Sequence, residues 1–386
     1  MQNNYTEQHP FTDLASGRKI LYIATRLYDY TEKLATIKLE EAILAGLSDA
    51  SEYLQIPLTC FPAFMPFRDT VENNEKIANT IKREDRAREI YLDDIKRLER
   101  LFALVSYLND PCKDDGICME IGFAFAKKVP VLAIVTDFIH YSSISNSEIE
   151  FILDPILVRM CNQVLHYKDL PGTKMTFPKD NNYDAMRRVA IDFEERLNAA
   201  NKQLYSLVRD RVKRMAIEPN DFINPLSIES NSPKKPKNGR TIFVDFAGGM
   251  YEWSRDYTKR LSGMLTKKGF IVQTGKRHDP NHQSNLHSVE RTPLNPYRLG
   301  EIDLHAALTS DVLVLSADAV ETDSGTAAIQ GAAKALNKEV VLYYSGNIQT
   351  NARDRAPTMR NLMLLYSASR IATKIDEIPG IIEATM

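Results

Sequence analysis

The stretch of sequence that decides the fold occurs twice, as DDGICMEIGFAFAKKVPVLAIV at residues 114–135 and as DSGTAAIQGAAKALNKEVVLYY at residues 323–344. Each copy places an Asp two residues before a Gly, and a run of small and apolar residues of helical length follows. A second Gly stands further along each run, at Gly122 and Gly331, and a short apolar segment typical of a strand comes next. The sequence therefore predicts the same helix–strand unit in two places, as an internal repeat.

Outward from these copies, strand-like and helix-like segments alternate along the whole chain. In the first half the predicted strands are residues 19–25, 102–107 and 129–136, and the predicted helices are 31–53, 86–101 and a segment from Gly116. In the second half the predicted strands are 241–245, 270–273, 312–316 and 339–344, and the predicted helices are 253–267, 299–309 and 324–337. This alternation is typical of doubly wound sheets. The predicted fold class is α/β, with two flavodoxin/Rossmann-like doubly wound parallel-sheet domains in tandem.

Composition marks the domain boundaries. Residues 1–18 are polar and predict a flexible arm, and residues 19–217 form the first predicted domain, which ends in a long helix from Tyr183. Residues 218–239 are rich in Pro, Ser, Asn and Lys, which cannot build a core, and predict a linker. The second predicted domain is residues 240–386.

Charge and hydropathy exclude several classes of protein. The 386 residues have a net charge of −2 and are 44% hydrophobic, so no basic surface for nucleic acid is expected. The longest apolar run is strand-sized, well short of the ~18 residues of a membrane span, and residues 1–13 lack the features of a signal peptide. Four cysteines are too few for a disulfide scaffold, and three spaced histidines in HDPNHQSNLH have no accompanying Cys. We expect a cytoplasmic protein without a metal site.

Four side chains are expected to meet at the carboxyl end of the first sheet, where doubly wound sheets bind their ligands. Tyr22 lies on the first strand, Asp114 precedes the repeated helix, Glu120 lies one turn inside it, and Asp94 comes from the preceding helix. Three carboxylates and a phenol suit chemistry at an acetal-like carbon. Each also has an ordinary interpretation: a solvated Glu, an N-cap Asp, a core Tyr, an Asp on a wet helix face. The apolar context MEIGFAFA favours a pocket for Glu120.

Over residues 19–137, and more weakly over 241–345 and 360–366, the chain resembles the nucleoside 2-deoxyribosyltransferases. The resemblance rests on D-D-G-I-C-M-E-I-G at 114–122, on ILYIAT at 20–25, and on Asp94 lying 20 residues before Asp114. It implies that Glu120 is the nucleophile that attacks the anomeric carbon and that Tyr22 orients it. It also implies that Asp94 and Asp114 hydrogen-bond and protonate the nucleobase, with Gly116 in the substrate-binding turn.

The second copy departs from the family pattern. Ile329 stands where the first copy has Glu120, and Phe243 stands where it has Tyr22, so the second domain is expected to be degenerate. The family completes each site with an Asn-Leu-Met segment from a neighbouring subunit, and here that segment occurs at residues 361–363, in the second copy. We therefore hypothesise a covalent pseudo-dimer with one working site, capped by Asn361 and Met363. The alternative is that the segment is ordinary core sequence. Arg68 is a further candidate contact to a phosphate or base, or else a structural ion-pair partner.

The resemblance implies a nucleotide-salvage transferase that uses a covalent deoxyribosyl-glutamate intermediate and no cofactor. Its partners would be a small-molecule deoxynucleoside and a free nucleobase, with neither nucleic acid nor membrane, and the pseudo-dimeric chains could assemble as a homo-oligomer. Two alternatives stay open: an N-glycosidase of the same superfamily acting on nucleosides or their monophosphates, and a non-catalytic nucleotide sensor.

Overall fold

The computed structural model describes residues 19–26, 30–58, 61, 63–64, 81–109, 113–136, 153–166, 183–222, 239–277, 296–318, 322–346, 350–352, 355–358 and 361–385. The predicted arm at residues 1–18 lies outside these ranges, as do Arg68, the three histidines of residues 278–287 and most of the predicted linker.

The first domain is built on a sheet of five parallel strands in the order β2-β1-β3-β4-β5. The strands are β1 (Ile20–Ala24), β2 (Ala63–Phe64), β3 (Leu101–Leu108), β4 (Val131–Val135) and β5 (Gln163–His166). Every residue of β1, β3 and β4 is buried, as expected for strands covered by helices on both faces.

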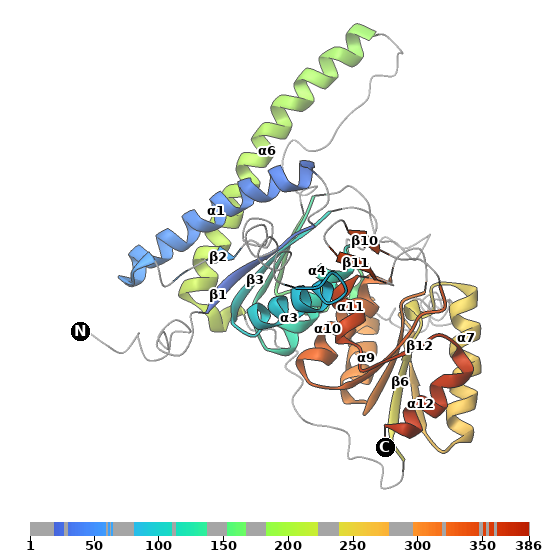
Figure 1. The fold of residues 1–386 in the computed structure, drawn as a ribbon. Coiled ribbons are helices and arrows are strands. Elements are labelled where there is room, and N and C mark those ends of the chain that lie inside the picture. Colours follow the sequence, from blue (N-terminus) through green and yellow to red (C-terminus); the bar gives the residue numbers. More distant parts are fainter. Residues whose placement is uncertain are drawn as a thin grey trace, which may run out of the picture.

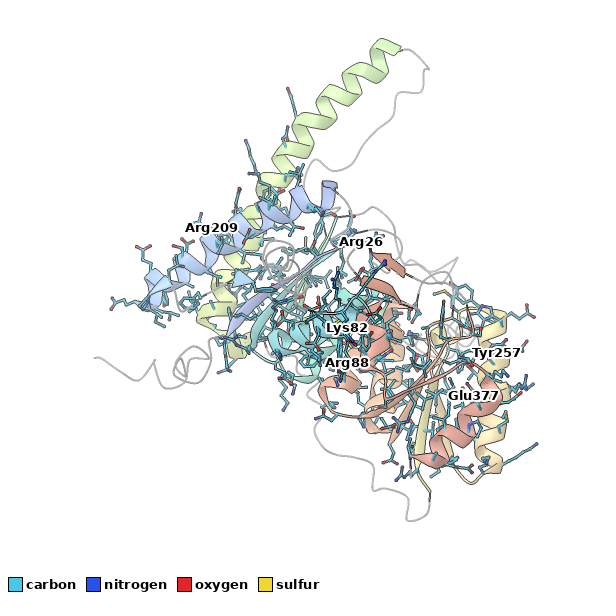
Figure 2. The ribbon with its side chains drawn as sticks, in the orientation of Figure 1. Arg26, Lys82, Arg88, Arg209, Tyr257 and Glu377 are labelled. Carbon is cyan, nitrogen blue, oxygen red and sulfur yellow. The ribbon has the colours of Figure 1, made fainter. Side chains whose placement is uncertain are left out.

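Helices cover both faces of this sheet (Figure 1). Leu21 and Ile23 of β1 face the long helices α1 (Tyr30–Leu54) and α6 (Tyr183–Ile217), because successive side chains of a strand point to opposite faces. On this outer side Arg209 of α6 pairs with Asp49 of α1 at 2.7 Å (Figure 2). Tyr22 points to the inner face, which carries α3 (Arg86–Leu98), α4 (Asp115–Ala126) and α5 (Pro155–Met160).

The second domain repeats this arrangement. Its strands β6 (Thr241–Asp245), β7 (Ile271–Thr274), β8 (Val312–Ser316), β9 (Glu339–Tyr343) and β12 (Arg370–Ala372) form a parallel sheet in the order β12-β9-β8-β6-β7. Followed from its β7 edge, the chain visits this sheet in the same sequence as the first. Helices α7 (Glu252–Lys267) and α12 (Ile378–Ala384) cover the outer face, and α9 (Pro296–Thr309), α10 (Ser324–Ala335) and α11 (Leu362–Ser367) cover the inner one.

The inner faces of the two sheets share one hydrophobic core, formed by residues of both domains. At its centre α4 packs against α10. A Cβ atom on Gly122 would overlap the carbonyl of Ala328, and one on Gly331 would overlap the carbonyl of Met119, so both glycines are needed for the helix backbones to approach this closely. The order of layers is therefore helices, sheet, two sets of helices, sheet, helices (Figure 1).

The predicted fold class is confirmed, since two parallel five-stranded sheets are each flanked by helices. The predicted long segments are present, with bounds that shift by a few residues. Elements too short for a periodic pattern were not predicted; they are β2, α5, β5, α11, β12, α12, the hairpin β10 (Thr350–Ala352) and β11 (Arg355–Thr358), and the 3-10 helices Pro219–Phe222, Ala247–Gly249 and Ile375–Glu377. Phe222, which the sequence analysis places in the linker of residues 218–239, packs in the core of the first domain, so this domain extends beyond residue 217.

Candidate active site

A buried phenol–carboxylate pair lies on the inner face of the first sheet. The hydroxyl of Tyr22, from the middle of β1, donates a hydrogen bond of 2.8 Å to Oε1 of Glu120, in the second turn of α4. Tyr22 is 2% exposed and Glu120 is 7% exposed. The sequence predicted that these two side chains converge, because both were expected near the carboxyl end of the first sheet.

Burial controls the protonation of this pair. The pKa of the Glu120 carboxyl is raised well above its ordinary value, first by burial and then by the negative charges of Asp94 and Asp114, while the hydrogen bond from Tyr22 opposes the rise. The pKa of Tyr22 is likewise raised, mainly by burial and by the charge of Glu120. Crowded carboxylates share protons, so one of them can be ionised while its neighbour stays protonated.

Asp114 caps the helix that carries Glu120. Its Oδ1 atom accepts hydrogen bonds from the backbone N–H groups of Gly116, at 2.8 Å, and Ile117, at 3.1 Å. The ordinary interpretation of Asp114 as an N-cap is therefore present in the structure. The same carboxylate is close enough to Glu120 for its charge to raise the pKa of that residue, so the cap also belongs to the cluster.

Asp94 reaches the site from α3, beside Arg97 and Phe64, which the sequence did not predict as site residues. Its side chain is 15% exposed and pairs with Arg97, one turn further along α3, at 3.2 Å. The Arg97 guanidinium also lies over the ring of Phe64, 4.3 Å from its centroid. The ring of Tyr22 also stacks on Phe64, at a centroid distance of 5.4 Å. Arg97 and Phe64 therefore support both Asp94 and Tyr22.

Asn361, from the second domain, lies at the same helix terminus. Its Nδ2 atom is 3.3 Å from the place that a Cβ atom on Gly116 would take, and Asp114 Oδ1 is 3.0 Å from that place. A side chain at position 116 would require both groups to shift by a few tenths of an ångström, so the glycine suits their close approach to the start of α4. The Asn361 side chain also accepts the N–H of Met363 at 2.9 Å and so caps α11. Met363 itself is 4% exposed and packs in the shared core.

The corresponding position of the second domain has no nucleophile. Phe243 on β6 and Ile329 on α10 are both fully buried, and both belong to the shared core. Within the described residues, no three His, Cys, Asp or Glu side chains come together as a potential metal site. Nor does any helix described here combine the length and apolarity that crossing a bilayer requires.

Part of the first domain is similar to a known protein family. Residues 36–185 match the family model described as nucleoside 2-deoxyribosyltransferase. A search of curated proteins gave no match. Among solved structures, one titled "Crystal structure of conserved protein from Enterococcus faecalis V583" is 21% identical and covers 39% of this chain and 92% of its own, with a TM-score of 0.29. That score is too low to support a conclusion about function.

Proposed function

We propose that the first domain, in which residues 36–185 match the nucleoside 2-deoxyribosyltransferase family model, exchanges the nucleobase of 2′-deoxyribonucleosides. The observation that carries the proposal is the buried hydrogen bond of 2.8 Å between Tyr22 and Glu120, next to Asp94 and Asp114. A carboxylate in this setting has the nucleophile, the orienting group and the nearby acids that cleavage of an N-glycosidic bond requires.

In the proposed first step, the ionised carboxylate of Glu120 attacks the anomeric carbon of the bound deoxynucleoside. A bond forms between that carbon and a Glu120 oxygen, and the bond to the nucleobase nitrogen breaks. The electron pair leaves with the base, and a proton from the Asp94–Asp114 side of the cluster neutralises it. The second step reverses the first with another base, which takes the sugar from Glu120. Every group required is a side chain of the chain itself, so the proposed reaction uses no cofactor.

Tyr22 has a definite part in this sequence. Its O–H stabilises the anion of Glu120, which burial and two neighbouring carboxylates disfavour. As the carboxylate loses its charge in forming the ester, the hydrogen bond weakens, and the phenol is positioned to restore the anion when the second base attacks. The absence of a 2-hydroxyl makes the cation-like transition state easier to reach, which accounts for a deoxyribose preference.

We also propose that the working site is shared between the domains, with Asn361 as the contribution of the second. Its amide lies beside the start of α4, at Gly116 and Asp114, where a bound sugar would approach Glu120. Exchanging Asn361→Asp keeps an oxygen to cap α11 and removes the amide donor, whereas Asn361→Ala removes both. A substrate role predicts that both changes lower turnover. Full turnover in Asn361→Asp would refute the shared site.

The test of the reaction is chromatography of the protein with deoxyinosine or deoxycytidine, with and without free adenine, beside Glu120→Ala. We expect deoxyadenosine only with the unchanged protein and added adenine. Free base without an acceptor would indicate a hydrolase instead. No product from any of several deoxynucleosides and their monophosphates would refute catalysis and favour a nucleotide-binding sensor.

A further inference from the structure

An arginine fills the part of the second domain that corresponds to the candidate active site of the first. Arg277 follows β7, and its side chain is completely buried. Its guanidinium donates from Nε to Asp154 at 3.1 Å, from Nη1 to Asp245 at 2.9 Å, and from Nη2 to Asp323 and to Thr326 Oγ1. This single cation therefore contacts several buried oxygens at once.

Two of the surrounding carboxylates, Asp323 and Asp303, occupy positions that correspond to the first site. Asp323 caps α10 as Asp114 caps α4, and Asp303 precedes it by the same 20 residues that separate Asp94 from Asp114. Asp303 lies 3.6 Å from Nη1 of Arg277, and it accepts the backbone N–H groups of Lys276 and Arg277 at 2.8 and 2.9 Å. These bonds fix the segment that carries the guanidinium. Arg277 therefore lies against residues that correspond to Asp94 and Asp114 of the candidate active site.

Asp154, the fourth carboxylate, comes from the first domain. It caps α5, and its oxygens lie against Gly325 at the start of α10, as Asn361 lies against Gly116 at the start of α4. The two domains thus exchange one side chain each. Asn361 approaches the first site with a neutral amide, and Asp154 approaches the second with a negative charge that suits a cation.

Attraction to the surrounding carboxylates holds the Arg277 guanidinium in place. Four carboxylates face one guanidinium. Burial lowers the pKa of Arg277, but the charges of the carboxylates outweigh burial and raise it, so the guanidinium stays protonated. Burial raises the pKa of Asp303 to about 6, although the charge of Arg277 opposes that rise. A neutral nucleoside that displaced the guanidinium would leave several carboxylates buried without a counter-charge, which is strongly unfavourable.

We propose that Arg277 is the permanent occupant of the second pocket, so that the chain binds one nucleoside rather than two, and that its ion pair with Asp154 ties the domains together. The stoichiometry rests on the function proposed above, whereas the occupancy does not.

Chemical rescue tests the occupancy. We expect Arg277→Ala to lower the melting temperature by on the order of 10 °C, because it leaves buried carboxylates unpaired. Guanidinium chloride at millimolar concentration, far below denaturing levels, should then raise the melting temperature of the variant but not that of the unchanged protein. Sodium chloride should not reproduce this effect. The control is Arg260→Ala, since Arg260 pairs with Asp376 on the exposed surface and is expected to matter little. An unchanged melting temperature, or no rescue, would overturn the proposal.

If Arg277→Ala does not fold, Arg277→Lys keeps the charge but loses the planar fork and should melt below the unchanged protein; equal melting would overturn the proposal. Binding of deoxyinosine to Glu120→Gln, measured by calorimetry, should saturate at one molecule per chain. Two molecules per chain would also overturn it. Unchanged protein that neither transfers nor hydrolyses deoxynucleosides would refute the proposed function, and the rescue experiment would still decide whether Arg277 occupies the pocket.

Discussion

Replacing Tyr22 by Phe removes one hydroxyl from the centre of the candidate site and leaves the ring stacked on Phe64. The lost contact is the hydrogen bond of 2.8 Å to Glu120, which favours the anion of that residue. A hydrogen bond to a buried charged group contributes about 1.5–3 kcal/mol. Because one pKa unit corresponds to 1.36 kcal/mol, the pKa of Glu120 should rise by about 1–2 units in the variant.

The direction in which the pH profile of base release shifts follows from the role of Glu120. The proposed nucleophile acts only when ionised, so a higher pKa moves the acidic limb of the rate profile to higher pH. On that limb, Tyr22→Phe should release base about 10- to 150-fold more slowly than the unchanged protein. Well above the limb the difference should shrink, because Glu120 is ionised in both proteins.

The assay is rapid-quench measurement of base release from a deoxynucleoside in a single turnover, repeated across the acid and neutral range. Tyr91→Phe is the matched control: Tyr91 is also buried on the inner face of the first domain, and its hydroxyl has no hydrogen-bond partner within the described residues. An acidic limb that stays in place in Tyr22→Phe, or one that moves equally in Tyr91→Phe, would refute the reasoning.

Three further predictions concern the second domain and the contact between domains. Gly122→Val forces α4 away from the backbone of α10 at Ala328, so the urea midpoint of this variant should fall by the equivalent of about 1–3 kcal/mol. The control is Gly263→Ala, whose new Cβ atom would meet no atom within 4 Å and should not destabilise the protein. Equal midpoints for the two variants would contradict the close packing of α4 and α10. Ile329→Glu places a carboxyl group among buried apolar side chains, so it should lower the free energy of unfolding by about 1–3 kcal/mol. It should also fail to restore base release to a Glu120→Ala chain. Restored release would mean that the second pocket is open. The pKa of Asp303 in the folded protein is raised to about 6, so the folded protein holds a proton that the unfolded chain loses near pH 4. The free energy of unfolding should therefore fall as pH rises from about 4 to 6, by up to about 3 kcal/mol relative to Asp303→Asn. If the urea curves of the two proteins differ equally at both pH values, Asp303 does not hold that proton.

The architecture and part of the candidate site could be predicted from the sequence because they depend on local patterns. Alternating strands and helices fix a parallel sheet, and a parallel sheet brings the first strand beside the helix that follows the third. The meeting of Tyr22 and Glu120 follows from this topology. The capping function of Asp114 and Asp323 follows from an Asp placed just before a helix.

The rest depends on contacts that no local pattern signals. Arg277 lies 123 residues from Asp154 and in the other domain, and its immediate sequence, TGKRHDP, resembles any polar loop. The stack of Arg97 on Phe64 depends on β2, which has only two residues and no detectable period. The one available signal for Asp154 was its place before Pro155 in EFILDPIL, in the region where the first copy lacks an Asn-Leu-Met run.

The crossing of α4 and α10 at Gly122 and Gly331 has a consequence for how such a protein can change over evolutionary time. In a symmetric dimer of identical chains, every substitution appears on both sides of the two-fold axis, so a mutation that spoils one pocket spoils both. Here the two sides are encoded by different codons. Asn361 can be retained beside α4 while Asp154 is retained beside α10, and selection can act on each half separately. One half is then free to lose its chemistry as long as it still supports its neighbour.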